Sequence, residues 1–163
     1  MATWLRAGRV GRPHGLDGSF HVSQPNPGLL TLGAHVTVGD RELRITRRAG
    51  TDARPILRLE GCEERSCAEA MTGVEILVAR HEAPELGPDE WWADDLEGCT
   101  VHDQGQTVGV VRRLLQLPSC EVLEVAREDG AGELLVPLVS DAVRSIDVER
   151  GEIEIDLRFL GAA

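Results

Sequence analysis

Short segments in which apolar and polar residues alternate, closed by glycine and aspartate turns, run through most of this chain of 163 residues. Residues 36–38 and 42–46 alternate on either side of the Gly39-Asp40 pair, which predicts a β-hairpin. Residues 152–157 alternate without a fault after a glycine-containing turn. Because short strands at regular spacing are typical of small barrels, we predict a mainly all-β fold with a closed or nearly closed β-barrel in each half. Periodicity alone leaves a β-sandwich as the alternative.

The other predicted elements follow the same pattern. Residues 63–71 contain helix formers with little β-branching, and Gly73 just beyond them is a typical C-cap, so a short helix is expected there. In the hairpin, Leu43 and Ile45 are expected to point inward and their polar neighbours to water. Further strands are predicted at residues 55–60, 74–78, 99–102, 107–111, 121–125 and 133–137.

A polar stretch at residues 80–90, with two prolines and a glycine, is typical of a linker. Charge changes at the same place: residues 1–82 hold 11 arginines and 10 acidic residues, a net charge of +1, whereas residues 83–163 hold 6 and 18, a net charge of −12. We therefore predict an N-terminal domain at residues 1–82, a linker at 83–90 and a C-terminal domain at 91–163. Each half, at about 80 residues, is long enough to fold alone.

The unequal charge of the two halves indicates partners of opposite character. Residues 1–58 hold 9 arginines against 4 acidic residues, a net charge of +5. A basic region suits phosphate, and the acidic half suits a basic protein. The alternative is that the acidic surface only keeps the protein soluble.

The absence of lysine and the scarcity of aromatic residues exclude several function classes. Without lysine, the chain has no P-loop motif, no lysine Schiff base and no lysine-containing kinase signature. Five scattered rings cannot form the stacking platform with which proteins read single-stranded nucleic acid. These rings are Trp4, Phe20, Trp91, Trp92 and Phe159.

No membrane or export segment is visible in the sequence. The first residues lack a basic-then-apolar leader, and the longest apolar run, residues 134–139, falls far short of the roughly 20 residues that span a bilayer. We therefore expect a cytoplasmic protein without membrane contact.

The four cysteines show neither a C-x-x-C pair nor a nearby histidine at zinc-ligand spacing. We expect buried or half-buried structural thiols in a reducing compartment, with no metal site and no cofactor. A metal site is the alternative. The cysteines are Cys62, Cys67, Cys99 and Cys120.

Candidate catalytic groups are few. The histidines have no neighbouring serine or cysteine arrangement that matches a nucleophile motif. Glu90, Asp94 and Asp95 cluster carboxylates, but at an expected helix start, where acidic groups offset the helix dipole. We expect no catalytic residue and no enzymatic activity, with an RNA-modifying or RNA-cleaving enzyme as the alternative.

Residues 8–18 contain four glycines, one proline and one histidine, which predicts a constrained turn out of the first strand. Arg9, Arg12 and His14 on this turn are candidates for holding RNA phosphate. The alternative is that the glycines only permit a tight reversal of the strand. A second set of candidates for a basic face is Arg44, Arg47 and Arg48, with Arg54 and Arg58 close in sequence; the alternative for them is a solvated strand edge.

Two adjacent tryptophans, Trp91 and Trp92, follow the linker in a chain with few other aromatic residues. Neighbouring residues do not share a face, so one ring is expected to anchor the domain core and the other to face the linker or a partner. The alternative is that both rings pack between the two barrels. Asp94 and Asp95 follow them and complete a candidate surface for a partner protein.

Two of these segments carry a family resemblance. Residues 8–18 resemble the opening of the ribosome maturation factor RimM family, with its Pro-His-Gly turn, and residues 90–98 resemble the start of that family's C-terminal PRC-barrel domain, with its paired aromatic residues. Further matches continue in order to about residue 157. The chain departs from the family pattern at Asp17, where a basic residue is usual, at Ser19, where an acid is usual, and at the tryptophans, which replace two tyrosines.

The resemblance implies an N-terminal translation-factor-like barrel and a C-terminal PRC-barrel. It implies a non-enzymatic assembly factor of the small (30S) ribosomal subunit, which binds the head ribosomal protein numbered nineteen and assists 16S rRNA processing and head folding. The expected partners are therefore that protein, the 30S subunit and precursor 16S rRNA, bound by a monomer. A PRC-barrel scaffold unrelated to ribosomes is the alternative.

Overall fold

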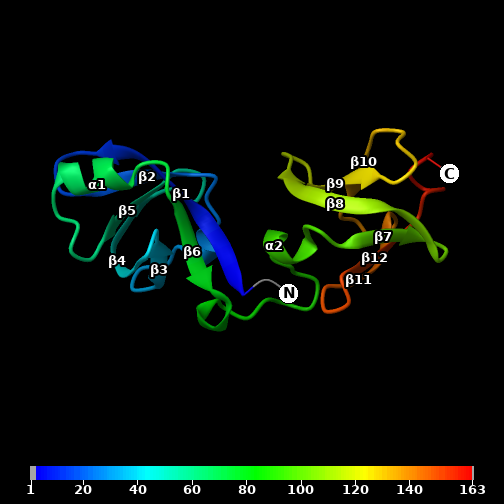
Figure 1. The fold of residues 1–163 in the computed structure, drawn as a ribbon, viewed down its shortest axis with the longest axis horizontal. Coiled ribbons are helices and arrows are strands. Elements are labelled where there is room, and N and C mark those ends of the chain that lie inside the picture. The colour runs from blue at the N-terminus through cyan, green and yellow to red at the C-terminus, as the bar shows by residue number, and fades with distance from the viewer. Residues whose placement is uncertain (1–2, 163) are drawn as a thin grey trace. The chain divides into compact units, whose positions relative to one another are not determined.

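The computed structural model describes residues 3–162. Met1 and Ala2, which belong to the segment where no leader is expected, and Ala163 lie outside the described residues. The chain divides into two compact units, one ending at Leu86 and one beginning at Gly87 (Figure 1). This division lies within residues 83–90; the bounds given above for the two domains and the linker stay a prediction. Within residues 3–162, no helix is long and apolar enough to cross a membrane.

The first unit is a closed six-stranded barrel with the strand order β1-β2-β5-β4-β3-β6, antiparallel throughout (Figure 1). Its core contains Phe20, Ile45 and Leu57, which are fully buried. A short helix, α1 (Arg65–Met71), packs against β1. The strands are β1 (Trp4–His14), β2 (Ser19–Ser23), β3 (His35–Val38), β4 (Arg41–Gly50), β5 (Pro55–Leu59) and β6 (Glu75–Ala79), and the 3₁₀ helices are η1 (Pro27–Leu29) and η2 (Arg80–Glu82).

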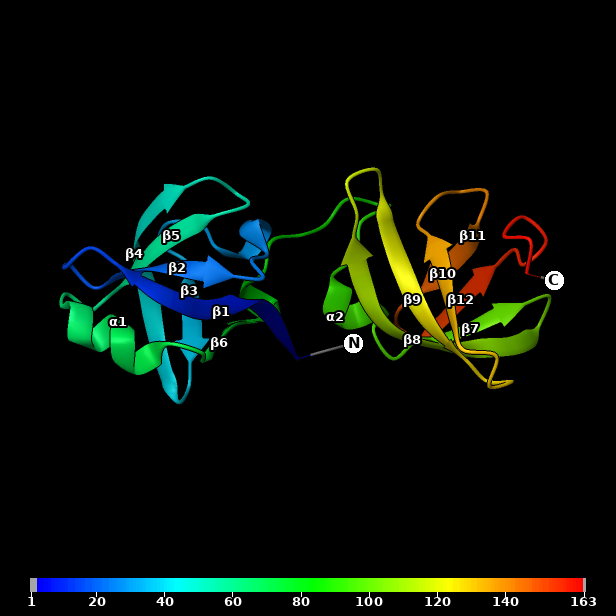
Figure 2. The ribbon, with the colours of Figure 1, turned by 90° about the horizontal axis from the view of Figure 1, so that it is seen from above.

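The second unit is a single six-stranded sheet with the order β10-β9-β8-β7-β12-β11, in which only β7 and β12 are parallel. Figure 2 shows its long strands β8 and β9 curving around the unit. Its core gathers Leu123, Val125 and Ile153 among other fully buried residues. The elements are α2 (Ala93–Leu96), β7 (Thr100–Asp103), β8 (Gln106–Gln116), β9 (Glu121–Arg127), β10 (Glu133–Pro137), β11 (Val143–Asp147) and β12 (Glu152–Ile155).

The predicted all-β fold with one barrel in each half is confirmed, as a closed barrel and an open curled sheet. The predicted hairpin is confirmed as β3 and β4, with Ile45 fully buried and Arg44 exposed. The predicted last strand ends at Ile155 instead of residue 157, because the Asp156 carboxylate accepts a hydrogen bond from the Phe159 amide at 3.0 Å and turns the chain.

Strand β1 corrects the interpretation of residues 8–18 as a turn. The strand continues to His14, and the chain reverses only between there and Ser19. Gly11 lies inside the strand, where a Cβ atom would approach the His21 carbonyl oxygen to 2.7 Å. This glycine therefore allows β1 and β2 to approach closely and does not make a turn.

Two of the cysteines also differ from expectation. Cys62 and Cys67 form a disulfide, with their Cα atoms 5.6 Å apart, so the prediction of free thiols is wrong for this pair. The reason is local: α1 begins between them, and its first turn brings the two side chains together. Cys99 and Cys120 are free, and burial together with the neighbouring Asp95 raises the pKa of the Cys99 thiol.

The turn between β1 and β2 provides a matched pair of glycine substitutions. Gly15 and Gly18 both have a positive φ, at 69° and 87°. A Cβ atom added at Gly15 would meet no atom within 4 Å, whereas one at Gly18 would collide with the carbonyl oxygen of Cys62. We expect Gly15→Ala to lower the free energy of unfolding by about 1–2 kcal/mol through the backbone conformation alone. Gly18→Ala is expected to cost about 3 kcal/mol or more, because the backbone carbonyl must also move.

Urea unfolding monitored by two-dimensional NMR, which reports each unit separately, measures the free energy of unfolding of both variants. Equal losses for Gly15→Ala and Gly18→Ala would contradict the close contact between the turn and Cys62. The second unit serves as the internal control, because its unfolding transition should not change in either variant.

Candidate nucleic-acid and protein interfaces

The end of the β1–β2 hairpin gathers positively charged and titratable groups. His14 closes β1, and its ring meets that of His21 edge to face, with 5.0 Å between the centroids. Partial burial lowers the pKa of His21, and the positive fields of Arg12, His14 and Arg54 lower it further. We call His21 and the three residues whose charges act on it the basic hairpin cluster. Arg12 and His14 are exposed and can reach an anion such as phosphate.

Sequence reasoning selected Arg12 and His14 for this role but missed His21. The missing information is strand register: Pro13 pairs with Phe20 and His14 with Ser19, which brings His21 next to the same end of β1. Arg54 immediately precedes β5, which pairs with β2. A hairpin prediction between residues 8–14 and 19–23 would have been the signal for grouping these residues.

Asp17, where the family pattern has a basic residue, organises a network inside the first unit. Its carboxylate accepts a hydrogen bond from the Ser19 amide at 3.1 Å and lies 3.4 and 3.3 Å from the Nη1 atoms of Arg47 and Arg58. Arg47 Nη1 also donates to Ser19 Oγ at 2.9 Å. The hydrogen bonds to Ser19, and then the two guanidinium groups, lower the pKa of Asp17. Arg47 is thus already bound within the chain.

The arginines 44, 47 and 48, predicted as one basic face, have three different environments. Arg48 donates to the Leu30 carbonyl at 3.1 Å and pairs with Asp52 at 3.0 Å, and only 18% of its side chain is exposed. A bulge between Ile45 and Arg47 interrupts the alternation of β4. Arg44 is exposed and pairs in register with His35. Contact of these arginines with RNA stays a prediction.

Arg9 lies on β1, and its side chain extends toward the start of the neighbouring strand β6. Its Nη1 donates to the Gly73 carbonyl at 2.6 Å, and its Nη2 lies 3.4 Å from Glu75 Oε1. Both charges are exposed, and exposed pairs of this kind stabilise a fold by less than about 1 kcal/mol. The Arg9 guanidinium can therefore exchange this partner for another anion at small cost.

The tryptophan pair begins the second unit. Trp91 is half-buried and packs against the core of this unit, and Trp92 is 9% exposed. The Trp92 carbonyl accepts the Asp95 amide at 3.0 Å, which starts α2. Asp95 is itself only 9% exposed, and its carbonyl accepts a hydrogen bond from Cys99 Sγ at 3.2 Å. This segment therefore offers a partner mainly the open parts of Trp91 and Asp94.

The three carboxylates considered for catalysis occupy structural positions. Glu90 Oε2 accepts a hydrogen bond from the Gly87 amide at 2.8 Å and closes the turn that leads into α2. Asp94 and Asp95 lie in the first turn of α2, as expected from the helix dipole. Their positions are explained without a chemical role.

The hairpin of β11 and β12 is an acidic surface feature of the second unit. Residues 141–156 contain six acidic residues and two arginines. Asp147 and Glu152 pair directly in register, and Glu149 lies in the turn between them; all three are exposed or half-exposed. We call this the acidic hairpin. Sequence reasoning missed it because β11 was not predicted: Val143 and Ile146 are three residues apart, and a bulge between Val143 and Ser145 breaks the alternation.

Comparison with known proteins identifies both units. Residues 5–83 match the family model described as the RimM N-terminal domain, and residues 93–159 match the RimM PRC barrel domain. The chain is 34% identical over 172 residues to the ribosome maturation factor RimM of Frankia alni, covering 96% of this chain and 95% of the relative. It is 33% identical over 154 residues to the protein of the same name from Sorangium cellulosum, covering 90% of each chain.

Among solved structures, a protein from Pseudomonas aeruginosa described as a 16S ribosomal RNA processing protein RimM aligns with 94% of this chain and 96% of its own length, at 29% identity and a TM-score of 0.43. The two family models match in order along the chain, and the two relatives span at least nine tenths of it. The resemblance seen in residues 8–18 and 90–98 is therefore confirmed. The chain belongs to the RimM family.

Proposed function

We propose that this chain is a non-enzymatic maturation factor of the small ribosomal subunit, acting in the cytoplasm on precursor 16S rRNA and on the head ribosomal protein numbered nineteen. The observation that supports this proposal is the match of both units to a family whose curated relatives are named ribosome maturation factors. The charge of the two units fits two different partners in such a particle.

The first unit is the side that would approach RNA. The basic hairpin cluster offers two exposed cationic or hydrogen-bonding groups, Arg12 and His14, near the end of the β1–β2 strand pair. Phosphate contacts of this kind position a protein on RNA without reading its sequence. This agrees with the shortage of aromatic side chains for base stacking.

The second unit is the side that would hold a basic protein. From Gly87 on it holds 17 acidic residues and 6 arginines, and this net charge of −11 attracts a cationic partner and raises the rate of encounter, mainly through exposed groups such as those of the acidic hairpin. Contact with Trp91 and Asp94 would exclude water and lengthen the residence time. Trp92 and Asp95, predicted as further contacts, would instead position these two from below the surface, because both are buried.

The two contacts together suggest how such a factor acts without chemistry. One chain that binds rRNA phosphate with one unit and a basic ribosomal protein with the other raises the effective concentration of each for the other. The factor would keep them together until the head folds, and then leave.

The RNA contact predicts a salt-dependent loss on charge reversal. Arg12→Glu combined with Arg54→Glu should weaken association with precursor small subunits, most strongly at low salt, because fewer counterions are released from the RNA. Co-sedimentation of purified protein with precursor subunits over a series of salt concentrations measures this. Arg41→Glu, an exposed arginine of β4 outside the cluster, is the control. Unchanged co-sedimentation of the double variant would remove the cluster from the RNA interface.

The protein contact predicts a separable effect of the second unit. Glu149→Gln combined with Glu152→Gln should lower the association rate with the purified head protein several-fold at low salt and leave the dissociation rate nearly unchanged. Trp91→Ala should instead raise the dissociation rate. Surface plasmon resonance measures both rates, and circular dichroism checks the fold of each variant.

Glu60→Gln combined with Glu63→Gln removes the same charge from the first unit and serves as the control. If all variants bind the head protein as tightly as the wild type, the second unit does not hold this partner. If the second-unit variants lost RNA binding and kept full binding of the head protein, the second unit would likewise not be the part that holds this protein.

A further inference from the structure

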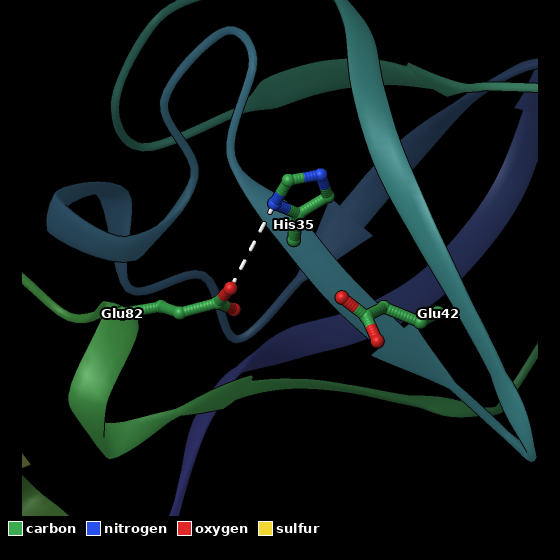
Figure 3. A group of neighbouring side chains, drawn as sticks. All are labelled: His35, Glu42 and Glu82. Carbon is green, nitrogen blue, oxygen red and sulfur yellow. Dashed lines mark ion pairs between the residues drawn. The ribbon is translucent and has the colours of Figure 1, made fainter.

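We propose that His35, Glu42 and Glu82 of the first unit bind a divalent transition metal ion of the zinc class. One ligand atom of each side chain can be chosen so that all three lie within 4.8 Å of one another (Figure 3). The Nδ1 atom of His35 lies 3.8 Å from Glu82 Oε1. The site is independent of the RNA and protein contacts proposed above.

Three segments that are distant in sequence bring these ligands together. Strand β3 carries His35 and Thr37 on the same face, and Thr37 pairs directly with Glu42 of β4, so Glu42 is a diagonal neighbour of His35. On its other side β3 pairs with β6, which leads directly into η2 and Glu82. The closed barrel thus holds both carboxylates beside the imidazole.

The chemistry of the three donors fits zinc. An imidazole nitrogen and carboxylate oxygens are common zinc ligands, with metal–ligand distances of about 2.0–2.2 Å. Donor atoms around such an ion lie roughly 3–3.5 Å apart, so the three groups must approach by about 1 Å. Rotation of the exposed glutamate side chains is enough for this movement. Two carboxylates supply two negative charges, which the nearby Arg44 offsets only in part.

The surroundings leave room for further ligands. A hollow of about 290 Å³, lined by His35, Glu82, Leu29 and Pro84 among others, opens beside the imidazole. Water or a donor atom from a partner can therefore complete the coordination sphere, as in zinc sites with three protein ligands. The bound ion would fasten η2, from which the chain leaves the first unit, to the β3–β4 hairpin.

The test uses the full-length chain and Zn²⁺ alone as the probe. Isothermal titration calorimetry should show one equivalent bound by the wild type. The variants His35→Ala, Glu42→Gln and Glu82→Gln should each bind at least about tenfold more weakly, since even the loss of a group that only supports a ligand costs 10–100-fold. His81→Ala and Glu85→Gln, which change exposed neighbours of Glu82 outside the site, should bind like the wild type.

Two results would identify a different site and overturn the proposal. One is loss of zinc binding in His14→Ala with full binding in His35→Ala, which would place the ion at the His14–His21 pair. The other is a thiolate charge-transfer band in the Co²⁺ spectrum, which would place the ion at Cys99 or Cys120. Absence of zinc binding by the wild type would also overturn it. Circular dichroism of each variant shows that a weaker affinity does not come from unfolding.

Discussion

Strand β1 pairs along both of its edges, with β2 on one side and β6 on the other, and this double pairing closes the first unit. The pairing with β2 brings His14 and His21 together at the end of the hairpin. On the other side, β6 pairs in turn with β3 and so carries Glu82 to His35. Gly11 makes the first pairing possible, because a side chain there would meet the His21 carbonyl. Both candidate sites of this unit therefore depend on the closure of one barrel.

Local sequence patterns predicted the helices and strands better than they predicted which distant residues these elements bring together. The Gly39-Asp40 pair predicted the β3–β4 hairpin because its turn chemistry is contained in two adjacent residues. In contrast, the approach of Asp17 to Arg47 and Arg58, 30 and 41 residues away, depends on barrel closure and has no local signal. The same holds for the effect of Arg12 and Arg54 on His21, and for Glu82 beside His35. Strand β11 was missed because a bulge hides its alternation.

The structure also shows which charged residues are already paired within the chain. Arginines 47, 48 and 58 are bound to carboxylates or carbonyls of the first unit, so its positive sequence segment is largely neutralised at those positions. In the second unit, Arg112, Arg113, Arg127 and Arg144 each pair with an acid, yet 17 acidic residues stand against 6 arginines from Gly87 on, so the negative charge persists. The net charge counted from the sequence therefore describes the charge that the second unit presents to a partner better than it does for the first unit.

The two units also differ in what their backbones offer. All strands of the closed barrel have neighbours on both sides, so recognition there must use side chains and loops. The sheet of the second unit ends at β10 and β11, and within residues 3–162 neither strand has a neighbouring strand along its outer edge. An extended segment of a partner can align with such an edge through the backbone alone. Recognition at that edge would tolerate substitutions in either protein, whereas recognition by the barrel would change with each side chain.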